Sequence, residues 1–222
     1  MSPCMDPDLP ATDESKFPRD ASKFPEHCRD AREELPRKFP RSGGKLAVTA
    51  AFVDASHAAD KVTQRSHSGH ILLVSRAPVK WHGKRQTTVE TSAFSSEFVA
   101  MECCIEDIEH LRFKLRMFGI PLGENEPETG ILCDNEAVLK NSSRVESAIN
   151  KRHPAAAHHF ARWNVEAKVC SAGWIPATQI IADAVTKLLP ETKCNASFHD
   201  WVHQEWILGG GFQASQAVQF AQ

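Results

Sequence analysis

Four acidic residues, in the order Asp, Glu, Asp, Asp, are the candidates in this chain for metal binding and catalysis. They are Asp54 in Ala-Phe-Val-Asp-Ala-Ser, Glu97 in Ser-Ser-Glu-Phe-Val-Ala, Asp134 in Ile-Leu-Cys-Asp-Asn, and Asp183 in Ile-Ile-Ala-Asp-Ala-Val-Thr-Lys. Carboxylates held close together repel one another, so a cluster of them needs protons or cations. Oxygen ligands without His or Cys favour magnesium or manganese over zinc. Two such ions can stabilise both the attacking and the leaving oxygen in phosphodiester cleavage. The pattern predicts a metal-dependent nuclease, although any single acid could follow a strand by chance.

The elements around these residues predict how they could meet. The almost wholly apolar run 46–53 predicts a buried central strand that ends at Asp54, and the short run 130–133 predicts a strand that leads to Asp134. Between them, the runs 71–74 and 79–81 and a further run around 87–89 are separated by polar, Gly or Pro breaks, with Ala77 and Pro78 as punctuation. Three successive strands with such breaks predict an antiparallel meander.

Apolar residues at steps of three and four predict a long helix over 94–118, with Gly119 as its C-terminal cap and Glu97 in its first turns. A second helix is predicted over 154–168, with Phe160 and Trp163 facing inward, followed by a last strand over 169–176. Thr178 can cap a final helix that runs to 188 and carries Asp183. This order of elements predicts an α/β protein with a mixed sheet.

Composition indicates one globular domain with irregular ends. Residues 1–44 are rich in Pro and charge and predict a disordered linker, 45–205 form the domain, and the Gly-, Gln- and Ala-rich residues 206–222 predict a flexible tail. No apolar stretch is long enough to span a membrane, so we expect a soluble intracellular protein, cytoplasmic or nuclear. The net charge of −2 gives no global electrostatic case for nucleic-acid binding, so any such surface must be local.

The cysteines and histidines predict no zinc site or disulfide framework. The 7 cysteines include no Cys-x-x-Cys pair, and most lie in apolar settings, which predicts reduced and buried thiols. His153, His158 and His159 cluster in sequence but lack a Cys or a second His pair at zinc spacing.

Seven blocks of sequence carry a resemblance to a known family, and their order matters more than any one of them. They are Val53-Asp54-Ala55-Ser56; Ser66-His67-Ser68-Gly69; Val79-Lys80-Trp81 with Lys84-Arg85-Gln86-Thr87; Ser95-Ser96-Glu97-Phe98-Val99-Ala100; Leu132-Cys133-Asp134-Asn135-Glu136-Ala137; Lys151-Arg152-His153 with His159-Phe160-Ala161-Arg162; and Ala182-Asp183-Ala184-Val185-Thr186-Lys187-Leu188-Leu189-Pro190. Over about residues 45–200 the chain resembles the ribonuclease H domain of copia-type LTR retrotransposon Pol polyproteins, from their reverse transcriptase/ribonuclease H region.

The resemblance implies a ribonuclease H-like fold, a mixed five-stranded sheet with its first three strands antiparallel, flanked by helices. It implies that Asp54, Glu97, Asp134 and Asp183 are the catalytic and metal-binding residues, with Asp54 and Asp134 as principal ligands. The enzyme would hydrolyse the RNA strand of an RNA–DNA hybrid with two Mg²⁺ ions, Mn²⁺ being an alternative. Its partners would be the hybrid and the reverse transcriptase domain of the parent polyprotein, with virus-like particles as one setting, and neither a membrane nor a small-molecule cofactor.

Recognition of a hybrid needs phosphate contacts and a test for the 2′-hydroxyl. The candidates for phosphate contacts are Lys80, Lys84, Arg85, Lys151 and Arg152, and those for the sugar edge are Gln86, Thr87 and Asn135. Each of them could instead be a solvated surface or turn residue. Trp81 could stack on a base, but a Trp in a Val-x-Trp strand is expected in the core.

Two other hypotheses remain open at this stage. The chain has no tyrosine, and His70, Phe98 and His158 occupy positions where copia-type domains commonly have aromatic hydroxyls. These departures favour a catalytically inactive retroelement remnant that keeps the fold and at most binds nucleic acid. An integrase or transposase core is disfavoured, because those enzymes use Asp, Asp and Glu, and Glu166 is the only acid near the required position.

Overall fold

The computed structural model describes residues 43, 46–75, 77–122, 128–143 and 155–188. The predicted tail 206–222, all of the predicted linker 1–44 except Gly43, and the candidates Lys151 and Arg152 lie outside these described residues. Every described helix and strand belongs to a unit that ends at Thr186. Within the described ranges, no helix is both long and apolar enough to cross a membrane.

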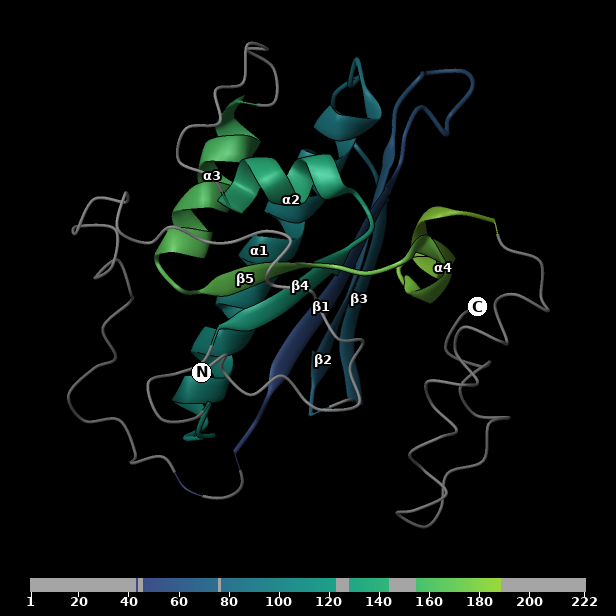
Figure 1. The fold of residues 1–222 in the computed structure, drawn as a ribbon. Helices are drawn as coiled ribbons and strands as arrows, with labels where there is room; N and C mark the ends of the chain where they lie inside the picture. Colours follow the sequence, from purple (N-terminus) through teal and green to yellow (C-terminus); the bar gives the residue numbers. More distant parts are fainter. Residues whose placement is uncertain (1–42, 44–45, 76, 123–127, 144–154, 189–222) are drawn as a thin grey trace, which may run out of the picture. The chain divides into compact units, whose positions relative to one another are not determined.

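Five strands form one mixed sheet in the order β3-β2-β1-β4-β5 (Figure 1). The strands are β1 (Thr49–Ser56), β2 (His67–Val74), β3 (Ala77–Arg85), β4 (Thr129–Cys133) and β5 (Cys170–Trp174). The first three pair antiparallel, while β4 pairs parallel with both β1 and β5. The predicted mixed sheet with an antiparallel first half is confirmed.

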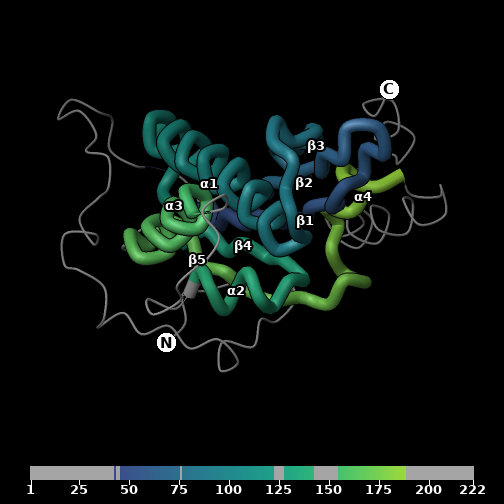
Figure 2. Tube along the Cα trace, turned by 90° about the horizontal axis from the view of Figure 1, so that it is seen from above, coloured from purple at the N-terminus to yellow at the C-terminus, as the bar shows by residue number. Residues whose placement is uncertain are grey.

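The helices are α1 (Ala93–Met117), α2 (Glu136–Ser143), α3 (Ala155–Glu166) and the short α4 (Asp183–Thr186), preceded by a 3₁₀ turn over Ala177–Gln179. Helices α1 and α3 lie on one side of the sheet and α4 lies on the other, as Figures 1 and 2 show. The central strand β1 is therefore covered on both faces, and seven of its eight residues are buried. That burial explains why its sequence is a continuous apolar run.

Helix α1 supplies a large part of the core on its side of the sheet. Its N-cap is Ser92, whose side chain accepts a hydrogen bond from the backbone N–H of Ser95, and the chain leaves the helix through Gly119 at φ 68°. Phe98, Met101 and other apolar side chains of α1 pack with Val53 and Leu72 of the sheet and with α3. The predicted helix and its glycine cap are confirmed.

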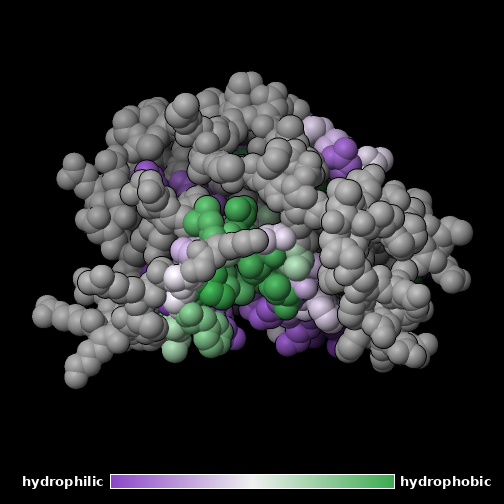
Figure 3. All heavy atoms as spheres, turned by 90° about the horizontal axis from the view of Figure 1, so that it is seen from below, coloured by the Kyte–Doolittle hydropathy of each residue, from purple (hydrophilic) through white to green (hydrophobic). Residues whose placement is uncertain are grey.

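A smaller apolar cluster lies where α1 ends and the chain enters β1. It consists of Ala47, Leu115 and Leu122, with Val74 and Ile120 packed against it. Seen from below, hydrophobic residues gather in the middle of the molecular face (Figure 3). The cluster fixes the end of α1 to the sheet, far along the helix from Glu97.

The predicted run 79–81 lies within the third strand, whereas the predicted run 87–89 is not a strand. The pairing of β2 with β3 ends at His67 and Arg85, and the next residue, Gln86, donates its backbone N–H to the carbonyl of Ser66 and its side-chain N–H to the carbonyl of Ser96. The strand covers Ala77–Arg85 and includes Pro78. A proline is tolerated there because β3 is an edge strand and its pairing shifts register opposite Leu72 and Leu73.

Predictions for several apolar residues are wrong. Trp81 is 57% exposed on the edge strand β3 rather than in the core, and Trp163 is 43% exposed on α3. The final helix is a single turn instead of an apolar-faced helix over 178–188, since Thr178 lies in the 3₁₀ turn and Leu188 is fully exposed. Amphipathic periodicity alone does not show whether a neighbouring element is present to cover an apolar face.

The described cysteines behave as predicted. Cys104, Cys133 and Cys170 are buried free thiols and Cys103 is a partly buried one. Burial raises the pKa of the Cys104 thiol well above its usual value. Cys104 is therefore protonated, and the buried thiols serve as small hydrophobic side chains.

Candidate metal centre

Two parallel strands position Asp54 and Asp134 at the same edge of the sheet. Phe52 of β1 pairs with Leu132 of β4, and each aspartate lies two residues further along its own strand direction. Asp134 directly follows β4, as predicted, whereas Asp54 lies inside β1, because the antiparallel pairing with β2 continues to Ser56. Because the strands are parallel and both aspartates lie the same number of residues beyond a paired position, their side chains lie close together.

Glu97 reaches the same place from α1. It is the fifth residue of that helix and is buried, as is Asp54, while Asp134 is half-buried. One carboxylate oxygen from each of Asp54, Glu97 and Asp134 lies within 4.8 Å of the other two. Three of the four predicted acids therefore form a cluster, which we call the carboxylate site.

Asp183 is the first residue of α4 and is half-buried, but it is not part of this close cluster. Its helix is nevertheless joined to the carboxylate site, because the hydroxyl of Thr186 donates a hydrogen bond to Asp54 Oδ2. The same hydroxyl lies 3.4 Å from the backbone carbonyl oxygen of Asp183. Thr186 was not predicted as a site residue, although it occurs in the Asp-Ala-Val-Thr-Lys block that identifies Asp183.

The donor atoms of the carboxylate site suit a hard divalent cation. Cys133 lies beside it, but burial, followed by the charge of Glu97, raises the pKa of this thiol far above its usual value. A protonated thiol is a poor ligand, so the available donors are carboxylate oxygens. Their mutual repulsion is relieved when a cation binds between them. The residues present therefore fit Mg²⁺ or Mn²⁺.

The loop after β4 is fixed by two local interactions. Trp174 of β5 donates its indole N–H to the backbone carbonyl of Asp134 at 3.1 Å. The side-chain oxygen of Asn135 accepts from the backbone N–H groups of Ala137 and Val138 and so caps α2. Asn135, a candidate for the sugar edge, is therefore engaged within the protein.

The other nucleic-acid candidates differ in their surroundings. Gln86 is buried, and its amide group donates to Ser68 Oγ and to the backbone carbonyl of Ser96, both at 2.8 Å. Lys80 forms an ion pair with Asp107 at 2.6 Å. Lys84 and Thr87 are exposed at the end of β3 and in the turn that follows.

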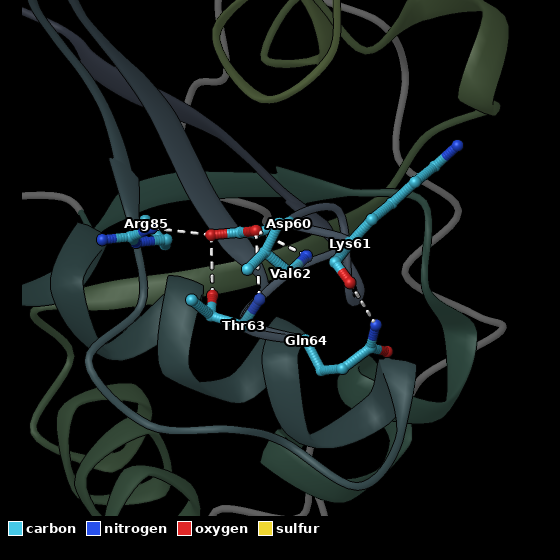
Figure 4. A network of polar contacts seen from close by, with 6 residues as sticks. All are labelled: Asp60, Lys61, Val62, Thr63, Gln64 and Arg85. Atoms are coloured by element: carbon cyan, nitrogen blue, oxygen red, sulfur yellow. Dashed lines mark hydrogen bonds and ion pairs between the residues drawn. The ribbon is translucent and has the colours of Figure 1, made fainter.

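Arg85 joins β3 to the loop between β1 and β2 (Figure 4). Its guanidinium lies 2.6 Å from Asp60 Oδ2, and the same carboxylate accepts hydrogen bonds from Val62 and Thr63. Hydrogen bonds from Thr63 and then from Arg85 hold the pKa of Asp60 well below its usual value. Arg85 is half-exposed, so its charge remains accessible at this edge of the sheet.

A second cluster of ionisable groups was not predicted from the sequence. His70 of β2 and His82 of β3 are directly opposed in the antiparallel pair, and Asp107 of α1 lies against them. The three residues are far apart in the chain, so no local spacing indicates them. A correct register for the β2–β3 pair would have identified the two histidines as neighbours.

Comparison with curated proteins finds retrovirus-related Pol polyproteins of plant transposons. Over 151 residues the chain is 23% identical to the retrovirus-related Pol polyprotein from transposon TNT 1-94 of Nicotiana tabacum, covering 68% of this chain and 11% of that protein. Over 154 residues it is 26% identical to the corresponding polyprotein from transposon RE1 of Arabidopsis thaliana, covering 69% of this chain and 10% of that protein. The chain thus spans about a tenth of the length of the relatives it matches. No protein-family model matches it.

Similar solved structures include LC11-RNase H1, isolated from compost, with a TM-score of 0.48, 14% identity, and coverage of 62% of this chain and 91% of that one. The RNase H1 of Halobacterium salinarum has a TM-score of 0.45 and 16% identity and covers 68% of this chain and 98% of that one. The sheet itself is five-stranded and mixed, with its first three strands antiparallel, as predicted above. The predicted resemblance is confirmed: the chain is similar to retrovirus-related Pol polyproteins of plant transposons, and its fold is ribonuclease H-like.

Proposed function

We propose that this chain is a metal-dependent endoribonuclease that hydrolyses the RNA strand of an RNA–DNA hybrid, as the ribonuclease H domain of a copia-type Pol polyprotein would during reverse transcription. The observation that carries the proposal is the convergence of Asp54, Glu97 and Asp134, whose carboxylate oxygens lie within 4.8 Å of one another. They come from a central strand, a helix and a loop. The fold does not require acidic side chains at the point where these three elements meet. Buried acids without a cation would destabilise the fold.

Asp54, Glu97, Asp134 and Asp183 would hold two Mg²⁺ ions, or two Mn²⁺ ions, with Asp54 and Asp134 as the principal ligands. When bound, such a pair activates a water for attack and stabilises the departing oxygen. The protein's own contribution is the position of its carboxylates. Thr186 orients Asp54 through a hydrogen bond, and Trp174 fixes the backbone of Asp134. Residues behind the ligands of a metal site commonly change its affinity or activity by about 10- to 100-fold.

The proposed hybrid would contact the edge of the sheet formed by β3. Lys80, Lys84 and Arg85 lie on this strand, and Thr87 follows it. Lys84 is exposed, and Lys80 and Arg85 would add positive charge for a phosphate when they part from Asp107 and Asp60. Phosphate contacts of this kind would position the duplex, and they would make binding depend on salt concentration.

Cleavage of a labelled RNA–DNA hybrid tests this proposal directly. The purified chain is expected to cut the RNA strand with Mg²⁺ and not with EDTA, while Asp134→Asn should abolish cleavage without loss of hybrid binding. Glu106→Gln is a suitable control, because it neutralises an exposed acid of α1 outside the carboxylate site. Equal cleavage by the Asp134→Asn variant would refute the assignment.

The same experiment distinguishes the proposed nuclease function from the main alternative. The alternative function is nucleic-acid binding, without catalysis, by a retroelement remnant. It is favoured because His70, Phe98 and His158 occupy positions where copia-type domains commonly have an aromatic hydroxyl. Under that alternative, the wild-type chain binds the hybrid and does not cleave it at any Mg²⁺ or Mn²⁺ concentration.

A further inference from the structure

A cluster of His70, His82 and Asp107 lies on α1 and the outer half of the sheet. His70 on β2 and His82 on β3 are directly opposed, and their imidazole rings are stacked with centroids 5.0 Å apart and planes within 4° of parallel. His70 Nε2 lies 2.8 Å from Asp107 Oδ2. One nitrogen from each histidine and one oxygen of Asp107 lie within 4.8 Å of one another. Three possible ligands from three separate elements therefore lie close together.

We propose that His70, His82 and Asp107 form a binding site for a divalent transition-metal ion, with Zn²⁺ as its best-suited occupant. Two imidazole nitrogens and one carboxylate oxygen are a set that zinc accepts, leaving a fourth position for water. Mg²⁺ prefers oxygen donors, so the carboxylate site and this site differ in the ions they select. The proposal is independent of the proposed nuclease function.

The surroundings of the three residues support metal binding. His70 is fully buried, so the packing around it holds this ligand in place. His82 and Asp107 are only half-buried, which gives an ion access from solvent. The ligands of a tetrahedral zinc ion lie roughly 3.3 Å apart, given Zn–N and Zn–O distances of about 2.0–2.1 Å. The three ligand atoms, which lie within 4.8 Å of one another, must therefore draw closer when an ion binds.

Two features limit the affinity of the site. Lys80 Nζ lies 2.6 Å from Asp107 Oδ1 and competes with a cation for this carboxylate, although the lysine is half-exposed and can turn away. When His70 Nε2 binds a metal, the imidazole proton moves to Nδ1, which is buried and has no hydrogen-bonding partner. An unpaired buried donor weakens binding. We therefore expect micromolar rather than nanomolar affinity.

A bound ion would join β2, β3 and α1. At present Asp107 contacts His70 through a hydrogen bond and Lys80 through an ion pair, and His82 contacts only the ring of His70 among the interactions described for this cluster. Coordination would attach His82, and with it the edge strand, directly to the helix. Zinc should therefore slow hydrogen exchange of the β3 backbone.

Titration of the full-length chain with Co²⁺, followed by its visible absorption and then displaced by Zn²⁺, tests the site. An Asp134→Asn background with excess Mg²⁺ and a thiol-free reductant limits binding at the carboxylate site. One ion with a tetrahedral spectrum is expected in this background. Adding His82→Ala or Asp107→Asn should weaken binding at least tenfold, whereas His110→Ala, at an exposed histidine of α1, should not change it.

Lys80→Met distinguishes a metal site from a hydrogen-bonded cluster. Removing the competing ammonium group should tighten Zn²⁺ binding about threefold or more, and this variant keeps all three ligands. The proposal is overturned if the parent chain and the His82→Ala variant bind Co²⁺ and Zn²⁺ equally well. It is also overturned if Lys80→Met fails to strengthen binding, because Asp107 would then not be a ligand.

Discussion

The hydroxyl of Thr186 donates a hydrogen bond to Asp54 although 132 positions separate the two residues in the chain. The bond joins the short helix α4 to the central strand β1, on the face of the sheet opposite α1. It uses one oxygen of Asp54 and so restricts how that carboxylate is turned. Asp54 is thereby oriented before any ion binds.

Thr186→Val removes this hydrogen bond with little change in side-chain volume. We expect Mg²⁺-dependent cleavage to fall by about tenfold, and the Mg²⁺ concentration for half-maximal activity to rise, since Asp54 loses its orientation. Steady-state rates measured across a Mg²⁺ series check this expectation. Thr178→Val, at an exposed threonine of the neighbouring 3₁₀ turn, should behave as wild type. A Thr186→Val enzyme with unchanged Mg²⁺ dependence would contradict the role assigned to the bond.

Gly69 allows α4 to lie close to β2. A Cβ atom at this position would come within 2.7 Å of Val185 Cγ2 and even closer to Thr186 Cγ2. Gly69→Ala should therefore displace α4, reduce cleavage, and lower the free energy of unfolding by about 1–3 kcal/mol. Urea denaturation and hybrid cleavage measure the two effects. Gly43→Ala is the matched control, because nothing lies within 4 Å of a Cβ atom there. Equal stability of the two variants would show that α4 does not pack against β2 as described.

The central part of the fold could be predicted from the sequence because each signal there is local. Leu132, Cys133 and the other apolar residues of β1 and β4 form uninterrupted runs, and the stripe of α1 ends at Gly119. Asp134 could be placed at a strand end for the same reason. Thr186 could not be predicted as a site residue, because its contact with Asp54 depends on the packing of α4 across the sheet.

Other predictions failed where exposure is decided by distant elements. Trp81 has the sequence context of a core residue, yet β3 is an edge strand and the ring is more than half exposed. Leu188 continues the apolar spacing of the last helix, but the helix ends at Thr186. The His70–His82 pair depends on strand register, which hydrophobic pattern alone does not fix in a strand as exposed as β3.

Lys84 and Arg85 should contribute unequally to hybrid binding. Arg85 must weaken its ion pair with Asp60 to contact a phosphate, whereas Lys84 is exposed on the same strand. We therefore expect Lys84→Gln to weaken binding more than Arg85→Gln. Fluorescence anisotropy at several salt concentrations checks this, and each substitution that removes a phosphate contact should reduce the slope of log K against log salt by about 1. Unchanged slopes for both variants would exclude β3 as the phosphate-binding edge.

His158 makes stability depend on pH. Burial, followed by the charge of Arg162, lowers the pKa of this histidine from 6.5 to about 4. Between pH 6.5 and pH 4 this histidine is protonated in the unfolded chain but neutral in the folded chain. The free energy of unfolding therefore falls as the pH drops from 6.5 toward 4. The loss is roughly 2–3 kcal/mol once pH 4 is reached.

His158→Phe isolates that contribution. The phenyl ring keeps an edge-to-face contact with Phe98 but loses the hydrogen bond to the backbone carbonyl of Asn141, which costs about 1 kcal/mol at pH 7. Urea denaturation at pH 7 and pH 5 should show a smaller decrease for this variant than for wild type. His110→Phe, at an exposed position, should retain the wild-type decrease. If His158→Phe loses as much stability as wild type on acidification, another group is responsible.

The parallel pairing of β1 with β4 has a consequence for how the protein folds. The hairpins of β1, β2 and β3 can form as soon as those residues are synthesised, but β1 meets β4 only after α1 is complete. The contact with α4 comes later still, near residue 186. Contacts between such distant segments form slowly because a long loop must close first. The acids are therefore kept apart in the nascent chain, and their repulsion arises only when most of the core that opposes it already exists.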